Sequence, residues 1–438
     1  MSLVFEKYTR KALNEEPKQH WVDDKWRVDY LAFTNAKVKN NKPVLIVGGA
    51  FQNFNAFRSF VEKFLEDFPV VLVDLPSLGN NDQLAEDLSM EGMAGVLHRF
   101  VEDHKLEKVS PVGLSLGSII VSTYAYQYPD ECEKLIITGI AEKPRKSWRM
   151  LLSESLDVLN KDRLEEFGSA VILYLLNHNR LDETGVSETA RNLFQRQLSS
   201  ASENEKERYR LNAKRLLDVD CLPGFPECQT LVCTGEFDTF TLPYEHAEFA
   251  DQCANATFSL IENADHLPQF ERMKETVALF SAFLNEESLE GLEGIKTYSP
   301  GTYTNLERRG EPRYVPVNTK AILHSDSVCS DELSEEELLH DIKVKVRNIN
   351  FFGCLIEFHQ DVFHLIEHAR DVTITLAHPD LQLDLLVFDQ AAHTMRCLFR
   401  HSDMKQAMAF KELLEDWSCF RLPGRDQDDG LSGYAHIP

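Results

Sequence analysis

Short, continuous apolar runs alternate with longer amphipathic stretches over residues 1–286 of the chain. Such a run predicts a strand buried on both faces of a parallel sheet, and apolar residues at helical spacing predict the helices between the strands. The runs cover residues 43–47, 70–74, 108–112, 134–138, 230–234 and 257–261, with helices expected at 57–68 and 90–104 and an edge strand near 26–33. This alternation predicts an α/β fold with a doubly wound sheet.

The alternation stops between residues 142 and 225, where no convincing strand is found. Helical periods at 148–159 and 164–176 predict an all-helical insertion between two sheet strands. An insertion at the edge where the strand ends converge is expected to form a cap over a site. The alternative is a helical excursion with no substrate role. The apolar run 171–176 would suit an acyl chain, although the same residues could form the core of the cap.

A second domain is expected after a linker at residues 287–306, which is acidic, then rich in Gly, Ser, Pro and Thr. Short β-like segments separated by turns predict a small antiparallel β-barrel over residues 307–420. The segments are 317–323, 342–346, 355–358, 372–376, 381–387 and 394–399, followed by an amphipathic helix at 403–417. The acidic run 331–337 is expected to be a solvated loop or short helix, and residues 421–438 a disordered tail.

Charge and cysteine content exclude several classes of protein. The 438 residues carry a formal net charge of −25, which argues against nucleic acid or an anionic membrane as the main partner. Nine cysteines without C-x-x-C spacing suggest reduced thiols in a cytoplasmic protein, with no metal site expected. The N-terminus shows no signal peptide, and no apolar run predicts a membrane span.

The motif Gly113-Leu114-Ser115-Leu116-Gly117 follows a predicted strand and opens a helical stretch. This is the context that a G-x-S-x-G nucleophile elbow requires, in which a serine on a strained turn is presented at the strand end. The residues two before and two after the serine must be small because strand and helix approach closely there. A serine and glycine turn without chemistry is the alternative.

A serine hydroxyl needs a histidine to take its proton and a carboxylate to orient that histidine. Asp238 and His266 each follow a predicted parallel strand, and the order Ser115, Asp238, His266 is the order of this motif's triads. Glu236 is a rival for the acid. Asp265 is a weaker one, because a residue adjacent to the base cannot easily reach its far ring nitrogen.

Two backbone N–H groups about 3 Å from the developing charge would form the oxyanion hole. One is expected from Leu116, directly after the nucleophile. The other is expected from Ala50, or from Phe51 as the alternative, on the loop that begins with Gly48-Gly49. An ordinary turn at this loop is the remaining possibility.

Over residues of about 40–285 the sequence resembles the α/β-hydrolase superfamily, on the motifs 113–117, 235–238 and 264–266. Gly48-Gly49, Val73-Asp74-Leu75-Pro76 and the Asp238 loop look similar to the hydroxyacyloxy-alkanoate synthase of rhamnolipid biosynthesis. That resemblance implies an ester or acyl-thioester substrate, with 3-hydroxyacyl groups delivered on acyl carrier protein or coenzyme A. It implies no cofactor for catalysis.

The second domain begins with R-x-x-x-R at Arg309 and Arg313, followed by Asn348, Asn350 and Gly353 in an N-x-N-x-x-G arrangement. Paired guanidinium groups can fork onto phosphates or a guanine edge. Over about residues 307–418 this resembles a PilZ domain, the bacterial receptor module for cyclic di-GMP, with Asn350 where the family has serine. The resemblance implies cyclic di-GMP as a regulatory ligand. A degenerate domain used only for protein contact is the alternative.

Together these features predict a bacterial serine hydrolase or acyltransferase whose PilZ-like domain responds to cyclic di-GMP. The rival from another class is a non-catalytic cyclic di-GMP effector that uses both domains for protein binding. Hydrolysis and acyl transfer stay open, because the choice depends on whether water or a bound hydroxyl reaches the acyl-enzyme.

Overall fold

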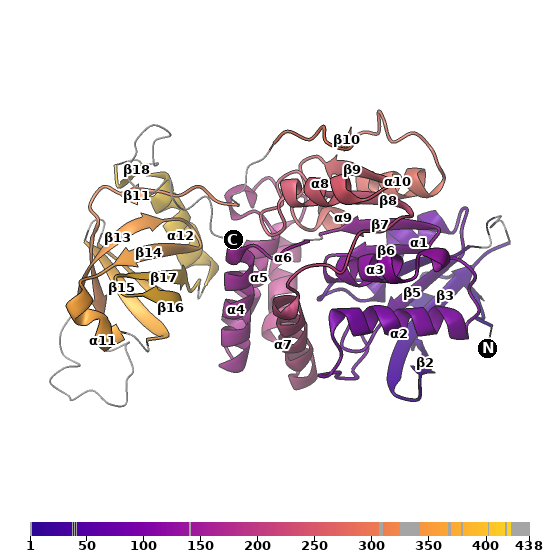
Figure 1. The fold of residues 1–438 in the computed structure, drawn as a ribbon, viewed down its shortest axis with the longest axis horizontal. Coiled ribbons are helices and arrows are strands. Elements are labelled where there is room, and N and C mark those ends of the chain that lie inside the picture. The colour runs from indigo at the N-terminus through magenta and orange to yellow at the C-terminus, as the bar shows by residue number, and fades with distance from the viewer. Residues whose placement is uncertain are drawn as a thin grey trace. The chain divides into compact units, whose positions relative to one another are not determined.

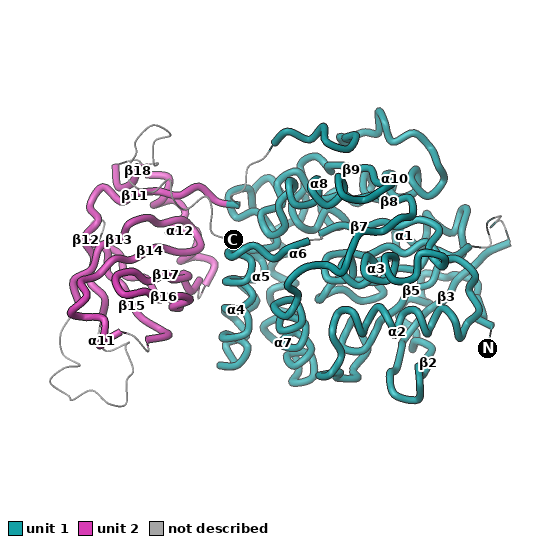
Figure 2. The backbone as a smooth tube through the Cα atoms, in the orientation of Figure 1, with its two compact units in different colours: residues 1–310 teal, residues 311–438 magenta. Residues whose placement is uncertain are grey.

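The computed structural model divides the chain into two compact units, residues 1–310 and residues 311–438 (Figure 2). It describes residues 2–36, 38, 40, 42–139, 142–305, 310–324, 342–366, 369–377, 380–401, 403–416 and 418–421. Arg309, the acidic run 331–337 and residues 422–438 of the predicted tail therefore lie outside the described residues. Arg421, predicted to begin the tail, instead belongs to a short strand, β18 (Phe420–Arg421).

The first unit is built on a ten-stranded sheet in the order β1-β3-β5-β4-β6-β7-β8-β9-β10, with β2 paired to β3 (Figure 1). Its parallel centre confirms the predicted doubly wound sheet. The parallel strands are β4 (Val44–Val47), β5 (Val70–Asp74), β6 (Ser110–Leu114), β7 (Lys134–Thr138), β8 (Gln229–Gly235) and β9 (Ala256–Ile261). Successive residues of β4 enter opposite hydrophobic cores, which explains the unbroken apolar runs.

The N-terminal part of the sheet differs from the sequence-based prediction. The strand expected at the edge is β3 (Trp26–Thr34), which lies inside the sheet because β1 (Glu6–Lys7) and β2 (Lys18–Val22) both pair with it. The turn between β2 and β3 uses positive φ at Asp23 and Asp24. Within the segment expected to be a linker, β10 (Ile295–Tyr298) pairs with β9 in antiparallel register.

Helices cover both faces of the sheet. One core contains residues of α1 (Arg58–Phe64) and α10 (Met273–Leu284), and the other contains residues of α2 (Met90–Asp103), α3 (Leu116–Gln127) and α8 (Pro243–Gln252). A short helix, α9 (Pro268–Glu271), follows β9. Single 3₁₀ turns are η1 (Ala12–Asn14), η2 (Phe54–Phe57), η3 (Pro129–Glu131) and η4 (His178–Arg180).

The predicted helical insertion forms four helices that stand together beside the sheet (Figure 1). They are α4 (Lys146–Asn160), α5 (Leu164–Leu175), α6 (Glu188–Ser199) and α7 (Glu203–Asp218). Aromatic and aliphatic residues of these helices form their own core, which includes Val158, Phe167, Leu198 and Tyr209. We call these four helices the cap.

The second unit is a closed six-stranded antiparallel barrel, as predicted, with the strands in the order β12-β13-β14-β17-β16-β15. They are β12 (Lys320–His324), β13 (Ile342–Ile349), β14 (Gly353–Glu357), β15 (Asp371–Ala377), β16 (Asp380–Ala391) and β17 (Thr394–Phe399). Phe410 of α12 (Met404–Glu415) packs against Phe351 and Phe399. The other elements are η6 (Gln360–Val362), α11 (Phe363–Ile366), β11 (Val315–Pro316) and β18 (Phe420–Arg421).

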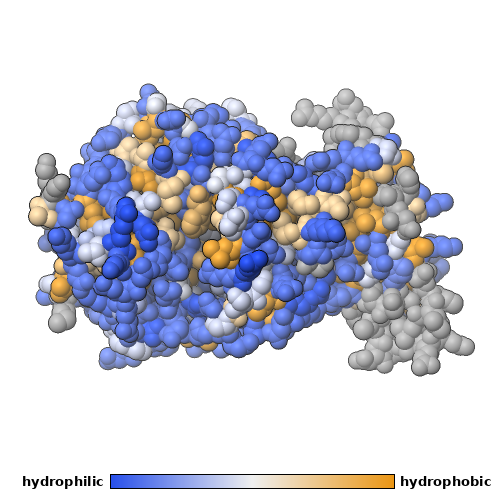
Figure 3. Space-filling view, turned by 180° about the vertical axis from the view of Figure 1, so that it is seen from behind, coloured by the Kyte–Doolittle hydropathy of each residue, from blue (hydrophilic) through white to orange (hydrophobic). Residues whose placement is uncertain are grey.

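The surface agrees with the charged composition. On the face drawn in Figure 3, hydrophilic residues cover most of the area, and hydrophobic residues lie in small groups between them. None of the helices in the described part of the chain has both the length and the apolar composition that crossing a bilayer requires.

Candidate active site

Ser115 lies on a sharp turn between β6 and α3 with backbone angles of φ 51° and ψ −118°. Positive φ is strained for a residue with a side chain, so the surroundings must hold this conformation. The Ser115 N–H donates to the Thr138 carbonyl at 2.7 Å. A Cβ at Gly113 would lie 2.7 Å from the Gly117 carbonyl oxygen, and one at Gly117 would lie 2.3 Å from that of Val47. Both glycines of the motif are therefore required by close backbone approach.

The structure brings Ser115, His266 and Asp238 into one hydrogen-bonded chain. Ser115 Oγ lies 3.0 Å from His266 Nε2, and His266 Nδ1 lies 2.9 Å from Asp238 Oδ2. Ser115 follows β6, Asp238 follows β8 and His266 follows β9, so all three residues sit at the carboxyl ends of parallel strands of one sheet. In this arrangement the imidazole can take the serine proton while the carboxylate holds its other nitrogen protonated.

Asp238 is fully surrounded by hydrogen-bond donors. Its Oδ2 accepts from the hydroxyls of Thr234 and Thr241 at 2.8 Å each, and its Oδ1 accepts from the N–H groups of Phe240 and Thr241 at 2.9 Å each. Burial acts to raise the pKa of Asp238, but the charge of His266 and these hydrogen bonds bring it down to about 2. The carboxylate is therefore ionised at neutral pH. Neither Thr234 nor Thr241 was predicted from the sequence to belong to the site.

The two rival acids make other contacts. Glu236 Oε2 accepts the Asn263 N–H at 3.2 Å, and its Oε1 lies 3.2 Å from Lys296 Nζ. Asp265 Oδ2 accepts the N–H of Asn177, a residue between α5 and η4, at 3.0 Å. The described contacts of His266 Nδ1 thus go to Asp238 and to the Thr241 hydroxyl at 3.1 Å.

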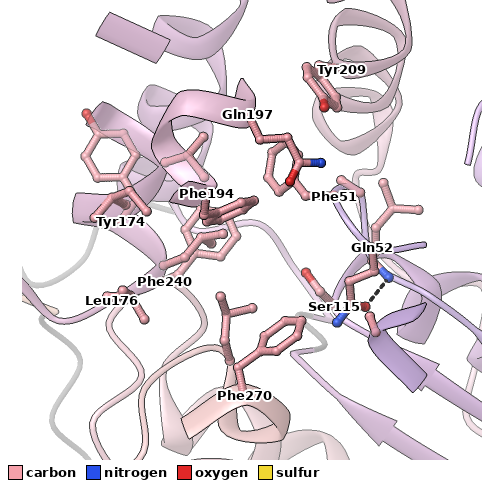
Figure 4. Close-up of a pocket in the computed structure, with 18 of the residues that line it drawn as sticks. Phe51, Gln52, Ser115, Tyr174, Leu176, Phe194, Gln197, Tyr209, Phe240 and Phe270 are labelled. Atoms are coloured by element: carbon pink, nitrogen blue, oxygen red, sulfur yellow. Dashed lines mark hydrogen bonds between the residues drawn. The ribbon is translucent and has the colours of Figure 1, made fainter. Parts of the chain in front are cut away.

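A tight turn holds the loop that was predicted to supply the second oxyanion donor. The Gly49 N–H donates to Gln52 Oε1 at 2.7 Å, and the Gln52 N–H donates to the Gly49 carbonyl at 3.2 Å. A Cβ at Gly49 would lie 3.1 Å from Ser115 Cβ and 3.2 Å from the Leu114 carbonyl oxygen, so a larger residue would need the loop or the serine to shift by a few tenths of an ångström. Ala50 stands at the tip of this turn and lines the same pocket as Ser115 and Leu116. Gln52 lies beside Ser115 in Figure 4 and was not foreseen.

Gly139 packs against both Ser115 and His266, and the buried imidazole of His246 accepts a hydrogen bond from its backbone. Gly139 has φ +77°, and a Cβ there would lie 2.9 Å from His266 Cε1 and 3.0 Å from Ser115 Cα. The Gly139 N–H donates to His246 Nε2 at 3.1 Å, while His246 Nδ1 donates to the Leu242 carbonyl at 3.1 Å. Burial lowers the pKa of His246 to about 4, so this imidazole is neutral and supports the site as a spacer. No sequence pattern points to it.

A cavity of about 630 Å³ opens above Ser115, between the sheet and the cap (Figure 4). Its walls are mostly aliphatic and aromatic. They include Phe51, Leu151, Leu152, Phe167, Val171, Ile172, Leu176, Phe194, Phe240, Leu267 and Phe270. Within the run 171–176, Val171 and Leu175 line the cavity and also belong to the cap core. The role as cap core is therefore observed, and binding of an acyl chain stays a prediction.

Phe51 lies on the loop that was predicted to supply the second oxyanion donor, and its ring contacts the cap. Its ring lies edge-on to Phe167 and Phe194 at centroid distances of 6.1 Å each, and to Tyr209 at 5.1 Å. Edge-to-face pairs at these distances are attractive beyond their buried area. The loop that faces Ser115 and the cap that closes the cavity are thus packed as one body.

The cap helix α7 is hydrogen-bonded to the segment after β5, which begins within the Val73-Asp74-Leu75-Pro76 motif. Arg215 of α7 donates to the Leu88 carbonyl at 2.7 Å and to Asn212 Oδ1 at 2.8 Å, and it also bonds the Ala85 carbonyl. Asn212 Nδ2 in turn donates to the Ser77 carbonyl at 3.0 Å. These bonds fix α7 over the cavity.

Asp265, which is buried, and Glu271, which is half-buried, connect the segment after β9 to residues of the helical insertion. Glu271 Oε1 accepts the Asp265 N–H at 3.2 Å, and a Cβ at Gly185 would lie 2.3 Å from the Glu271 carbonyl oxygen. Burial raises the pKa of Glu271 to about 8 and that of Asp265 to about 6. The pair is therefore partly protonated near neutral pH.

In the second unit, a pair of backbone bonds places the segment after Arg313 beside the predicted asparagines. The N–H groups of Tyr314 and Ile349 donate to each other's carbonyls at 2.8 and 2.9 Å. Asn350 Oδ1 accepts the N–H groups of Phe352 and Gly353 at 3.1 and 2.9 Å, which closes the β13–β14 turn. A Cβ at Gly353 would lie 2.2 Å from the Cys397 carbonyl oxygen, so this glycine also has a packing reason. Asn348 is half-buried at a bulge of β13, and Arg313 is exposed.

One group in the described residues has the donors that could hold a metal ion, namely His98, Glu102 and Glu131. The two nitrogens of His98 face different carboxylates, with Nε2 at 3.3 Å from Glu102 and Nδ1 at 2.9 Å from Glu131. Tyr124 also donates to Glu131 at 2.8 Å. These contacts account for the cluster as a network of hydrogen bonds and ion pairs.

A parallel sheet that presents a serine on an elbow, a carboxylate and a histidine at its strand ends defines the class of α/β-hydrolase folds. The family model described as "alpha/beta hydrolase fold" matches residues 42–272, and the chain belongs to this family. Among solved structures, the fold is similar to MGS-M2, an α/β hydrolase from a deep-sea metagenome library. That match has a TM-score of 0.54 and 19% identity, and covers 60% of this chain and 96% of that one.

Two curated relatives show the range of the similarity. A poly(3-hydroxyalkanoate) depolymerase of Ectopseudomonas oleovorans is 26% identical over 115 residues, which are 25% of this chain and 41% of that protein. The monoacylglycerol lipase ABHD6 of Homo sapiens is 28% identical over 273 residues, which are 56% of this chain and 76% of that protein. The chain thus spans well under two thirds of the depolymerase and a larger share of the lipase.

Proposed function

We propose that this protein is a serine hydrolase or acyltransferase that cleaves esters or thioesters of hydrophobic acyl groups. The observation that carries the proposal is the hydrogen-bonded chain Ser115–His266–Asp238 at the floor of an apolar cavity of about 630 Å³. Ser115 attacks the acyl carbonyl, and His266 takes its proton while Asp238 stabilises the imidazolium. The N–H groups of Leu116 and Ala50 receive the oxyanion.

Collapse of the tetrahedral intermediate would release an alcohol or a thiol, which takes the proton from His266. The acyl group then stays on Ser115 until a second nucleophile arrives. That nucleophile is water in hydrolysis and a bound hydroxyl in acyl transfer, and His266 acts as the base for either one. The apolar cap helices provide the wall against which the acyl chain lies.

The substrate class that we favour is the 3-hydroxyacyl ester or thioester, on acyl carrier protein or coenzyme A. Support comes from two resemblances, the loops similar to hydroxyacyloxy-alkanoate synthase and the sequence similarity to a poly(3-hydroxyalkanoate) depolymerase. Both names concern ester bonds between 3-hydroxy acids. The apolar cavity suits the hydrocarbon part of such groups.

A fluorophosphonate probe and a substrate panel would test the proposal. We expect the probe to label Ser115 in the full-length protein and labelling to be lost in Ser115→Ala. Thioesters of 3-hydroxyacyl groups and their non-hydroxylated counterparts, in several lengths, would then be compared with products identified by mass spectrometry. Turnover of neither series, together with an unlabelled Ser115, would favour the binding-only effector instead.

We further propose that the barrel unit binds cyclic di-GMP through Arg309 and Arg313, with Asn348, Asn350 and Gly353 shaping the opposite side. The bonds between Tyr314 and Ile349 support this by holding the end of the arginine motif beside the β13–β14 turn. Asn350 uses its Oδ1 within the turn, so its Nδ2 is the group that would donate to the ligand. Arginine suits two phosphates and two guanines because its planar fork can bind either.

Calorimetry on the full-length protein would test this second part. Removing a guanidinium that pairs with a phosphate costs about 1.5–3 kcal/mol, so Arg309→Ala and Arg313→Ala should each weaken binding by about tenfold or more. Lysine at either position should rescue little. No heat at tens of micromolar ligand would refute ligand binding, and binding without altered turnover would make the barrel a localisation module.

A further inference from the structure

Two cysteines that are far apart in the sequence meet at the amino ends of two adjacent parallel strands, β7 and β8. Cys132 Sγ lies 3.4 Å from Cys228 Sγ. Cys132 precedes β7 and Cys228 precedes β8, and these neighbouring parallel strands are in register with Lys134 opposite Gln229. Since adjacent strands are about 4.8 Å apart, the sheet itself holds the two backbones at a spacing suited to a cross-link.

The two thiols differ in exposure in a way that suits an attacking and a resolving cysteine. Cys228 is half-buried, whereas Cys132 is only 3% exposed. The contact between the two sulfurs lowers the pKa of the Cys228 thiol and raises that of Cys132. Nucleophilic sulfur is the thiolate, so Cys228 is the thiol that reacts first.

We propose that Cys132 and Cys228 form a redox-active pair that a disulfide-bonded small thiol oxidises reversibly to a protein disulfide. Closing the sulfur separation from 3.4 Å to the bonded length of about 2.05 Å needs only a small side-chain movement.

The chemistry is two successive thiol–disulfide exchanges. The Cys228 thiolate attacks one sulfur of the small disulfide, which breaks its S–S bond and releases one small thiolate. Cys132 then loses its proton and attacks the Cys228 sulfur, and the mixed disulfide breaks to release the second small thiolate. The net change converts two protein thiols and one small disulfide into one protein disulfide and two small thiols.

The cross-link would enclose the whole cap. The segment between Cys132 and Cys228 contains α4, α5, α6 and α7, so the disulfide would turn it into a covalent loop. Closing a loop of this length restricts the unfolded chain strongly. Both cysteines precede their strands, whereas Ser115, Asp238 and His266 follow theirs, so the bond forms at the opposite edge of the sheet from the serine.

The test treats the full-length protein with oxidised glutathione and maps disulfides by mass spectrometry of non-reduced peptides. We expect the peptide with Cys132 to be joined to the peptide with Cys228, and thiol reductant to reverse the link. The midpoint of thermal unfolding should rise by on the order of 10 °C on oxidation. Cys228→Ser should abolish both effects, and Cys132→Ser should trap glutathione on Cys228.

Two other sites in the chain serve as controls. Cys221 is exposed and can take up glutathione, but Cys221→Ser should leave the cross-link unchanged. Cys354 and Cys397 lie opposite each other across β14 and β17 but are both buried, so they should stay reduced. The proposal is overturned if Cys228 stays unmodified, keeps glutathione although Cys132 is present, or pairs with Cys253. Peptide mapping of the unmutated protein decides this even if a variant folds poorly.

Discussion

Replacing Asp238 with asparagine removes one charge and keeps the size of the side chain. In the native protein, both carboxylate oxygens accept hydrogen bonds, Oδ1 from two backbone N–H groups and Oδ2 from two threonine hydroxyls and His266. Asparagine offers only one acceptor oxygen. The asparagine oxygen can therefore accept either from the backbone N–H groups or from the imidazole, but not from both.

The cost of leaving the backbone N–H groups unpaired determines which way the amide faces. If the asparagine oxygen faced His266, the buried N–H groups of Phe240 and Thr241 would be left unpaired, at about 1–3 kcal/mol each. The oxygen should therefore face the backbone, with the NH₂ group toward His266 Nδ1. His266 must then accept at Nδ1 and carry its proton on Nε2, where it cannot take the proton of Ser115. We expect a loss of about 10⁴-fold in kcat, equivalent to about 5.5 kcal/mol.

The assay is steady-state turnover of an activated acyl ester by the full-length protein, with thermal unfolding measured alongside. Glu236→Gln is the matched control, because Glu236 lies on the same loop and bonds Asn263 and Lys296. We expect this control to retain turnover within about threefold of the native value, as for a surface substitution. Labelling by a fluorophosphonate should fall in Asp238→Asn in parallel with turnover.

Asp238→Asn with at least about a tenth of native turnover would refute the tautomer argument, because the effect would be far below that of a lost orienting carboxylate. An equal loss in Glu236→Gln would move the acid to position 236. A collapse of thermal stability in Asp238→Asn would leave turnover uninformative, and the labelling rate of the folded fraction would then decide.

Three further outcomes follow from the same contacts. Gln52→Met removes the oxygen that accepts the Gly49 N–H and so loosens the turn that positions the oxyanion-hole donor of Ala50. Because that donor acts on the transition state, kcat should fall by about tenfold or more while KM changes little. An unchanged kcat with a raised KM would contradict this. Glu271 has a folded pKa of about 8, above its unfolded value, so its contribution to stability is full at low pH and is lost as pH rises through about 8. Glu271→Gln should therefore flatten the pH dependence of urea unfolding between about pH 4.5 and 8, and an unchanged slope would contradict the assignment. Leu176→Trp narrows the cavity. If two methylenes of a long acyl chain lose their burial, kcat/KM for long chains should fall by about tenfold relative to short ones. An equal loss for all chain lengths would argue that this wall does not contact the acyl chain.

Much of the fold follows from local pattern. The strand runs predicted the parallel centre of the sheet because a strand buried on both faces must be apolar at every position, as in β4. The edges were harder to predict. β3 was taken for an edge strand because nothing in residues 18–22 has an apolar pattern, yet β2 pairs there through its backbone. Likewise, β10 has only four residues and gains its order by pairing with β9.

The residues predicted for the site contact one another for a reason that sequence can express. An elbow motif fixes the serine, and residues that follow neighbouring parallel strands must emerge at the same edge of the sheet. Thr241 could have been suspected, because it lies three positions after Asp238 with a hydroxyl within easy reach. Gln52 follows the predicted oxyanion loop but has no pattern of its own.

What the sequence determined by itself is therefore whatever depends on neighbours along the chain: the periods of helices and strands, the glycines of the elbow, and the order of serine, acid and base. What only the tertiary structure decided depends on residues that folding brings together. Gly139 meets His246 across 107 positions, and Cys132 meets Cys228 across 96. The walls of the cavity come from the four cap helices and from the segments that follow β4, β6, β8 and β9. Such contacts leave no periodic pattern in the sequence. Close packing requires side chains of matching shape and hydrogen bonding, and places no constraint on how far apart they lie along the chain.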